Sequence, residues 1–171
     1  PMKGVFRSVA VRSVVKRSTA YIAAGSSLGD RNAYLDKAVG LLRAERLVLS
    51  VEESRRIPTE PHGGAPKGEF LNSALKVVTL LTADELFAVM RRIENECGRE
   101  RSVHWGDRTL DLDMIFFDGE VRGEGDLILP HPEMHKRAFV LEPLAEIAPY
   151  VVHPLFGKRV SELLAELYTG F

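Results

Sequence analysis

The segment RTLDLDMIFFDG, residues 108–119, contains the clearest structural pattern of this 171-residue chain. Its leucine, methionine, isoleucine and phenylalanine side chains predict a β-strand over residues 110–117. Asp118-Gly119 is a turn signal, and a further short strand is expected at residues 120–121. The segment therefore predicts a strand followed by a tight turn.

Side chains alternate between the two faces of a strand, so Asp111 and Asp113 point to the same face. The other face takes the apolar side chains Leu110, Leu112, Met114 and Phe116. We expect the apolar face to pack against helices. The two carboxylates then lie on the open face, about 7 Å apart along the strand.

Hydrophobic periodicity and capping signals predict five further elements around this strand. In chain order they are a strand at 19–24, a helix at 30–43, a strand at 47–51, a strand at 71–80 and a helix from 82 to 98. The order strand, helix, strand, strand, helix, strand is that of a ferredoxin-like α+β sandwich. We expect a mainly antiparallel sheet with both helices on one face and the ligand site on the other.

Two local patterns add detail to this fold. Leu47, Leu49 and Val51 share one face of the second strand if it alternates regularly. Five prolines between residues 129 and 154 leave room only for short helices, and a closing helix is expected at 161–168.

Charge is distributed unevenly along the chain. Residues 1–18 carry five basic side chains and no acidic one, whereas the remainder carries 18 basic against 24 acidic side chains. We interpret residues 1–18 as a basic N-terminal extension without an assigned role, and residues 19–171 as one domain. The acidic body argues against a nucleic-acid partner, because duplex binding requires many neutralised phosphates.

Composition excludes several other classes of protein. No apolar run reaches the roughly 20 residues of a membrane span, so we expect a cytoplasmic protein without a membrane partner. The single cysteine, Cys97, excludes an internal disulfide framework and a cysteine-based zinc site. The chain is expected to act as a monomer.

The paired carboxylates indicate metal chemistry. Two carboxylates held this close repel each other unless a positive charge lies between them. Magnesium takes oxygen ligands, commonly one or two carboxylates together with substrate phosphates. The pattern therefore indicates a magnesium site at Asp111 and Asp113, while two solvated aspartates balanced by nearby arginines remain the alternative.

Three arginines, Arg99, Arg101 and Arg108, precede the strand in an irregular stretch that also holds Trp105. Arginine is the preferred side chain for bidentate phosphate contacts. Because the P-loop pattern GxxxxGK[ST] is absent from the sequence, the combination indicates phosphoryl-type transfer from a metal-bound nucleotide by another route. The alternative is a solvated loop whose arginines balance the neighbouring aspartates.

Two further segments carry candidate ligand-binding residues. Phe70 and Asn72 share a strand face, and a ring beside an amide suits a flat heterocycle. Taken alone, a core phenylalanine and a turn-capping asparagine explain that segment better. His131, Arg137 and Phe139 recur in a proline-framed segment, where the absence of HExxH argues against zinc.

Five segments in this order resemble the 6-hydroxymethyl-7,8-dihydropterin pyrophosphokinase family of folate biosynthesis. They are AYIAAGSSLGD, PTEPHG, EFLNSAL, RIENECGRERSVHWGDRTLDLDMIFFDGEV and LPHPEMHKRAFVLEPLAEIAP, within residues 19–155. The segment that here reads HWGDRTLDLD is highly specific to that family.

The resemblance implies that ATP donates pyrophosphate to the hydroxymethyl group of the pterin and that AMP is released. It implies Asp111 and Asp113 as ligands of two Mg²⁺ ions, and Arg99 and Arg108 as catalytic residues. The pterin site that it implies consists of Thr59, Glu60, His62, Phe70, Asn72, Trp105 and Phe139. The ATP site that it implies consists of Glu94, Arg101, Trp105, Arg108, Met114, His131 and Arg137.

Two other functions fit part of the same pattern. Another two-metal nucleotide enzyme on a ferredoxin-like sheet, a nucleotidyltransferase or a cyclase, would use the paired aspartates without a pterin slot. A non-catalytic ligand-binding domain of the same topology would neither release AMP nor depend on magnesium.

Overall fold

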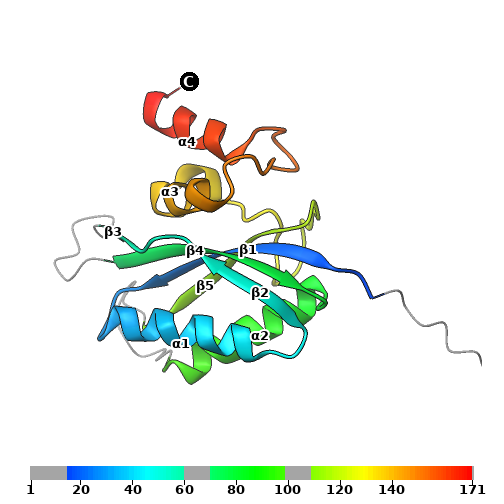
Figure 1. The fold of residues 1–171 in the computed structure, drawn as a ribbon. Coiled ribbons are helices and arrows are strands. Elements are labelled where there is room, and N and C mark those ends of the chain that lie inside the picture. The colour runs from blue at the N-terminus through cyan, green and yellow to red at the C-terminus, as the bar shows by residue number, and fades with distance from the viewer. Residues whose placement is uncertain (1–14, 60–69, 99–108, 171) are drawn as a thin grey trace, which may run out of the picture.

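The computed structural model describes residues 15–59, 70–98 and 109–170. An antiparallel sheet forms its centre, with helices above and below it (Figure 1). The strands are β1 (Ser18–Ser26), β2 (Val48–Glu53), β3 (Ile57–Thr59), β4 (Phe70–Thr79) and β5 (Asp111–Phe117). The helices are α1 (Arg31–Ala44), α2 (Ala83–Glu96), the 3₁₀ turn η2 (Met134–Lys136), α3 (Ala138–Ile147) and α4 (Val160–Thr169).

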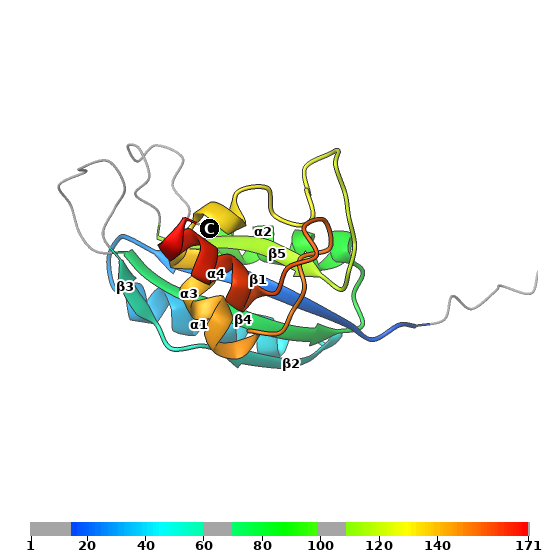
Figure 2. The same ribbon diagram turned by 90° about the horizontal axis from the view of Figure 1, so that it is seen from above.

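The strand order is β2-β4-β1-β5, and β3 pairs with the part of β4 that β2 leaves free. With α1 after β1 and α2 after β4, this is the ferredoxin-like arrangement, so the predicted fold class is confirmed. Helices α1 and α2 lie together on one face of the sheet. The opposite face is open only in part, because α3 packs on it and α4 lies outside α3 (Figure 1 and Figure 2).

Local sequence signals set the ends of α1 and α2. Asp30 caps α1 by accepting a hydrogen bond from the backbone N–H of Ala33 at 3.0 Å. Thr82 and Glu85 form the predicted capping box at the start of α2. Gly98 follows α2 with a φ of 74°, a left-handed conformation that glycine adopts without strain.

Strand β5 departs from strict alternation near its end. The register between β1 and β5 shifts there, which is the mark of a β-bulge. As a result Phe116 points toward α3 and lies in the same apolar cluster as Ile115. The prediction that Phe116 shares a face with Leu112 and Met114 is therefore wrong, whereas those two residues do pack with α1 and α2.

Strand β2 contains a similar shift of register, between Val48 and Ser50. Val48 and Val51 are the buried residues of this strand, while Leu47 and Leu49 are 39% and 45% exposed. The prediction that both leucines share a face with Val51 is wrong, because the bulge exchanges the two faces at that point.

The connecting segments also differ from expectation. In the described residues, positions 120–121 form no strand, and an isolated bridge joins Arg122 to Leu129 instead. Strand β3 was not predicted. Helix α3 is ten residues long although Pro143 lies at its sixth position, where proline removes the N–H that would otherwise bond to the carbonyl of Phe139.

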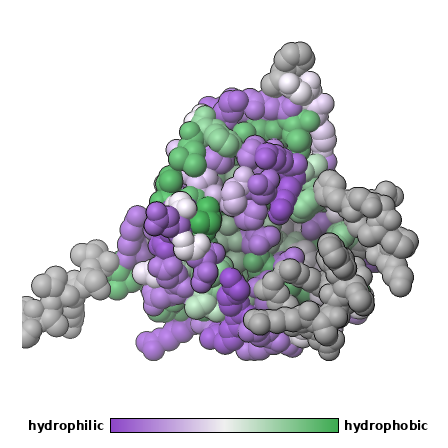
Figure 3. Space-filling view, turned by 180° about the vertical axis from the view of Figure 1, so that it is seen from behind, coloured by the Kyte–Doolittle hydropathy of each residue, from purple (hydrophilic) through white to green (hydrophobic). Residues whose placement is uncertain are grey.

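The layer of α3 and α4 has its own apolar cluster against the sheet, which includes Ile115, Phe116, Met134, Val140, Leu141, Leu144, Val160 and Leu163. Apolar side chains also gather on the outside of this layer, seen in green in the upper part of Figure 3. The exposed large apolar residues of α4 and of the loop before it include Val152, Leu155, Phe156 and Leu167. Among the described helices, none has the length and apolarity to cross a membrane.

His153 holds the loop between α3 and α4 in shape. The residue is 2% exposed, and its Nδ1 accepts hydrogen bonds from the backbone N–H groups of Leu155 and Phe156 at 3.2 and 3.0 Å. Burial lowers the pKa of His153, and the neighbouring His135 lowers it further. The folded protein therefore resists protonation of this ring.

We expect the free energy of unfolding to fall as the pH drops below about 6.5, the pKa of an unperturbed histidine. Below that value the unfolded chain binds a proton that folded His153 does not bind. The contribution of His153 to the free energy of unfolding is fully present above the pKa that the residue has in the unfolded chain. It is lost as the pH falls toward the lower pKa of the folded protein, by at most about 1.4 kcal/mol per pH unit. Urea unfolding at a series of pH values measures the slope. His153→Gln, which keeps an acceptor, should flatten it, and an equal slope in the variant would contradict this assignment.

Candidate active site

A row of paired residues crosses three strands at the open end of the second face. Asn72 of β4 pairs with Gly25 of β1, and Gly25 pairs in turn with Asp111 of β5. Residues paired directly across antiparallel strands present their side chains on the same face. Asn72 and Asp111 therefore face the same way with a glycine between them. Asp113 joins this face through its pairing with Ala23.

Gly25 is required for the close approach of the Asn72 side chain. A Cβ added at Gly25 would lie 2.8 Å from Oδ1 of Asn72, which is too short for any contact of this kind. Asn72 is 8% exposed and its Nδ2 donates a hydrogen bond to Oγ1 of Thr59 at 2.6 Å, so the amide is held in place. The amide oxygen consequently lies over the floor that Gly25 provides.

A cleft of about 280 Å³ runs along the outer edge of β5. Five of the residues singled out from the sequence line it together: Glu94, Asp111, Asp113, Met114 and His131. The structure thus brings residues from α2, β5 and the segment before η2 to one site. The two carboxylates line this cleft and are also paired with Gly25 and Ala23 of β1. They therefore lie between the cleft and the small residues of β1, which form the floor beside Asn72.

Seven other residues line the same cleft and were not singled out as site residues: Phe87, Arg91, Leu112, Asp126, Leu127, Ile128 and Pro132. The guanidinium carbon of Arg91 lies 4.7 Å from the centre of the Phe87 ring, one helical turn away. An arginine and an aromatic residue at this spacing on α2 are the signal that could have revealed them.

Glu94 supports β5 from α2. Its side chain is 4% exposed, and Oε2 accepts a hydrogen bond from the backbone N–H of Leu112 at 3.1 Å. Leu112 separates Asp111 from Asp113, and its N–H points out of the edge of the sheet. Glu94 therefore holds the backbone from which both carboxylates project.

His131 borders the cleft beside Asp113. Its backbone N–H donates to the carbonyl of Ile115 at 3.0 Å, which ties the segment to β5. Its Nδ1 accepts the N–H of Glu133 at 3.2 Å, so the proton of the neutral ring lies on Nε2. Burial lowers the pKa of His131, against the opposing effect of Asp113. A neutral ring with one N–H donor results.

The two phenylalanines expected to hold a flat heterocycle lie at the starts of α3 and β4. Phe139 packs against the cluster that contains Ala74, two positions along β4 from Asn72. The guanidinium carbon of Arg137 lies 5.7 Å from the centre of the Phe139 ring. Phe70 is only partly buried and pairs with Thr59 on β3. Phe70 is thus next to Thr59, the hydrogen-bond partner of Asn72, and Phe139 belongs to the cluster between α3 and the sheet.

The remaining sequence-predicted residues lie outside the described parts of the chain. They are Glu60, His62, Arg99, Arg101, Trp105 and Arg108. The expectations for these six residues stay predictions.

The donor set suits a metal that arrives with its substrate. Within the described residues, no group of three or more His, Cys, Asp or Glu side chains is placed to hold a metal ion. Magnesium needs only one or two protein carboxylates when substrate phosphates complete its shell, because it keeps several other oxygen ligands. Asp111 and Asp113, on one face and lining one cleft, fit that requirement.

Paired carboxylates beside a cleft are typical of enzymes that transfer phosphoryl groups with the help of bound metal ions. Residues 21–149 match the family described as 7,8-dihydro-6-hydroxymethylpterin-pyrophosphokinase (HPPK), and the chain belongs to this family.

Two curated relatives show the extent of the similarity. The 2-amino-4-hydroxy-6-hydroxymethyldihydropteridine pyrophosphokinase of Bacillus subtilis is 46% identical over 132 residues, 77% of this chain and 79% of the relative. The protein of the same name from Aquifex aeolicus is 35% identical over 150 residues, 87% of this chain and 92% of the relative.

Solved structures show the same fold at low sequence identity. The HPPK-DHPS protein of Plasmodium falciparum superposes with a TM-score of 0.66 at 14% identity, over 91% of this chain. The match covers 45% of that longer chain, so this chain spans less than half of it.

Proposed function

We propose that the β5 cleft and the floor around Gly25 form the active site for the reaction that family membership gives this chain. The chain is a pyrophosphoryl transferase of folate biosynthesis: it transfers pyrophosphate from ATP to 6-hydroxymethyl-7,8-dihydropterin. The hydroxymethyl oxygen attacks the β-phosphorus, the bond from that phosphorus to the α-phosphate oxygen breaks, and AMP leaves. The observation that carries the site assignment is the common face of Asn72, Asp111 and Asp113.

We assign the metal and phosphate contacts as follows. Asp111 and Asp113 would hold two Mg²⁺ ions together with the triphosphate. When bound, magnesium neutralises the negative charge on the pyrophosphoryl group that is transferred. Arg99 and Arg108 stabilise the same charge as catalytic residues, and their positions in the sequence just before β5 support this.

The nucleotide lies in the cleft along β5. Glu94, Met114 and His131 line it, and Phe87, Leu127 and Ile128 add apolar surface for a base. The Nε2–H donor of His131 suits a phosphate oxygen. Arg137 lies close enough to His131 to affect its charge. Arg101 and Trp105 are assigned to the nucleotide site by resemblance to the family alone.

The pterin lies over the floor between Asn72 and the carboxylates. The amide oxygen of Asn72 accepts from the N–H edge of the heterocycle, with Thr59 holding the amide in position. Phe70 and Phe139 are the stacking rings. Trp105 and the backbone near Glu60 and His62 complete the slot by resemblance to the family.

Phe139→Ala is expected to weaken pterin binding by about tenfold, because one stacked ring contributes on the order of 1–3 kcal/mol. Calorimetry with the pterin and a non-hydrolysable ATP analogue measures the effect. Phe156→Ala, which removes a ring that does not line the β5 cleft, is the matched control. Equal pterin affinity in Phe139→Ala and the unmodified protein would remove Phe139 from the site.

The test of the whole proposal is release of AMP from ATP in the presence of magnesium and 6-hydroxymethyl-7,8-dihydropterin. AMP should appear only with the pterin present, in equal amount to the pterin diphosphate. ATP turnover that ignores the pterin would instead favour a nucleotidyltransferase or a cyclase.

We further propose that residues 19–171 act as one domain, as a monomer in the cytoplasm. Support for a monomer is that Asn72, Asp111, Asp113 and His131 come from a single chain. Support for the location is the use of ATP as co-substrate. The two substrates are the expected partners, without nucleic acid or membrane.

A further inference from the structure

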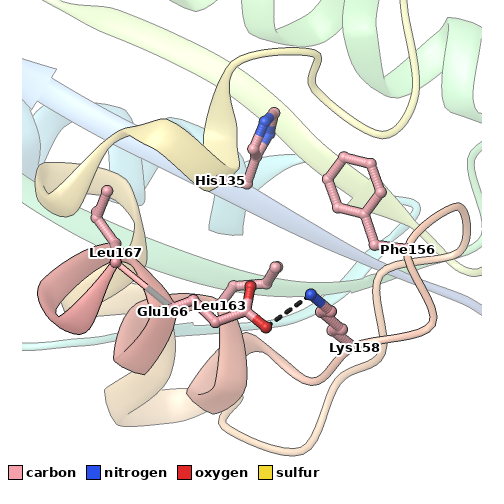
Figure 4. Close-up of a pocket in the computed structure, with 7 residues that line it drawn as sticks. His135, Phe156, Lys158, Leu163, Glu166 and Leu167 are labelled. Atoms are coloured by element: carbon pink, nitrogen blue, oxygen red, sulfur yellow. Dashed lines mark ion pairs between the residues drawn. The ribbon is translucent and has the colours of Figure 1, made fainter.

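A second pocket lies between η2, α4 and the loop that joins α3 to α4. Its volume is about 390 Å³, and it is lined by His135, Phe156, Lys158, Leu163, Glu166, Leu167 and Gly170 (Figure 4). None of these residues lines the β5 cleft. A pocket of this size accommodates a small organic molecule.

One part of the pocket is apolar, and neighbouring rings hold its aromatic side chain in place. The Phe156 ring is stacked on His153 with ring centres 4.0 Å apart, and it meets His135 edge-on at 4.9 Å. Leu163 and Leu167, one helical turn apart on α4, add aliphatic surface. Phe156 is nevertheless 46% exposed, so the ring offers apolar surface to a ligand.

The other part of the pocket carries one charge of each sign. Nζ of Lys158 lies 2.6 Å from Oε1 of Glu166, and the two side chains are 45% and 34% exposed (Figure 4). An anion attracted to Lys158 would meet the Glu166 carboxylate, and a cation attracted to Glu166 would meet the Lys158 ammonium. A ligand with adjacent ammonium and carboxylate groups satisfies both side chains at once.

Hydrogen bonding on the wall of the pocket is also incomplete. Nδ1 of His135 is buried and has no hydrogen-bond partner in the described part of the chain. Buried polar atoms are normally paired, so this unpaired nitrogen is an exception in the wall of the pocket.

We propose that this pocket binds a free α-amino acid with a large apolar side chain. The carboxylate of the ligand pairs with Lys158 and its ammonium group pairs with Glu166. The apolar side chain lies against Phe156 and Leu167. The site is separate from the proposed active site, so the two proposals stand or fall independently.

Calorimetric titration of the full chain with chosen probes tests the ligand class. L-Phenylalanine and L-leucine should each bind saturably at one site. 2-Phenylethylamine lacks the carboxylate and 3-phenylpropionate lacks the ammonium group, and each should bind at least about tenfold more weakly than L-phenylalanine. Equal binding of either analogue, or no saturable binding of the amino acids, would overturn the proposal.

Variants locate the binding. Lys158→Met and Glu166→Gln should each weaken L-phenylalanine binding about tenfold or more, and Leu167→Asp should abolish it. Lys136→Met is the matched control, because Lys136 pairs with Glu133 outside the pocket, and it should bind normally. Each variant should keep its thermal midpoint and its AMP release. Unchanged binding of L-phenylalanine in all three pocket variants would show that the amino acid does not bind in this pocket.

Discussion

Alanine in place of Asp111 or Asp113 is expected to lower the rate of AMP formation by about 10³-fold or more. Both carboxylates line the β5 cleft, and both project from the face that carries Asn72. Without either one, the charge that gathers on the transferring pyrophosphoryl group loses part of its neutralisation. Single-turnover quench-flow with saturating ATP, magnesium and pterin measures the loss directly.

Two controls separate catalysis from folding in these variants. Both aspartates are only partly buried, so circular dichroism and the thermal midpoint should match those of the unmodified protein. Asp126→Ala removes an acidic side chain that lines the same cleft from another segment, and it should cost far less activity. Substantial turnover in Asp111→Ala or Asp113→Ala would end the metal assignment.

Glu94→Ala should lower kcat by about 10- to 100-fold, the range found when the supports of metal ligands are removed. The reason is the 3.1 Å hydrogen bond from the backbone N–H of Leu112 to the Glu94 carboxylate. Loss of this bond leaves a buried donor unpaired between Asp111 and Asp113, and the strand edge can then shift. Steady-state kinetics should show the loss in kcat, with the KM for the pterin little changed.

Glu94→Gln distinguishes positioning from charge. The glutamine amide keeps an oxygen that can accept from Leu112, so this variant should recover most of the rate. A second readout is the magnesium concentration for half-maximal activity, which should rise in Glu94→Ala and fall back in Glu94→Gln. A glutamine variant as impaired as the alanine variant would show that the charge of Glu94 matters and that positioning is not its role.

Several features of the fold followed from neighbouring residues in the chain. Asp30, Thr82 and Glu85 cap helices by contacts within three residues, so local pattern was sufficient. The common face of Asp111 and Asp113 followed from alternation over three consecutive residues. Alternation failed at Leu47, Leu49 and Phe116, where a partner strand imposes a bulge that single-strand periodicity does not contain.

The order of elements and the paired carboxylates were thus readable from the chain, because capping and side-chain alternation act over a few residues. The meeting of Asn72, Gly25 and Asp111 in one row, and of Glu94 with the backbone of β5, depended on strand register and helix packing. The packing of α3 on the second face of the sheet, with α4 outside it, depended on the same factors. These contacts join residues far apart in the sequence, and their geometry is set by how the layers pack against one another.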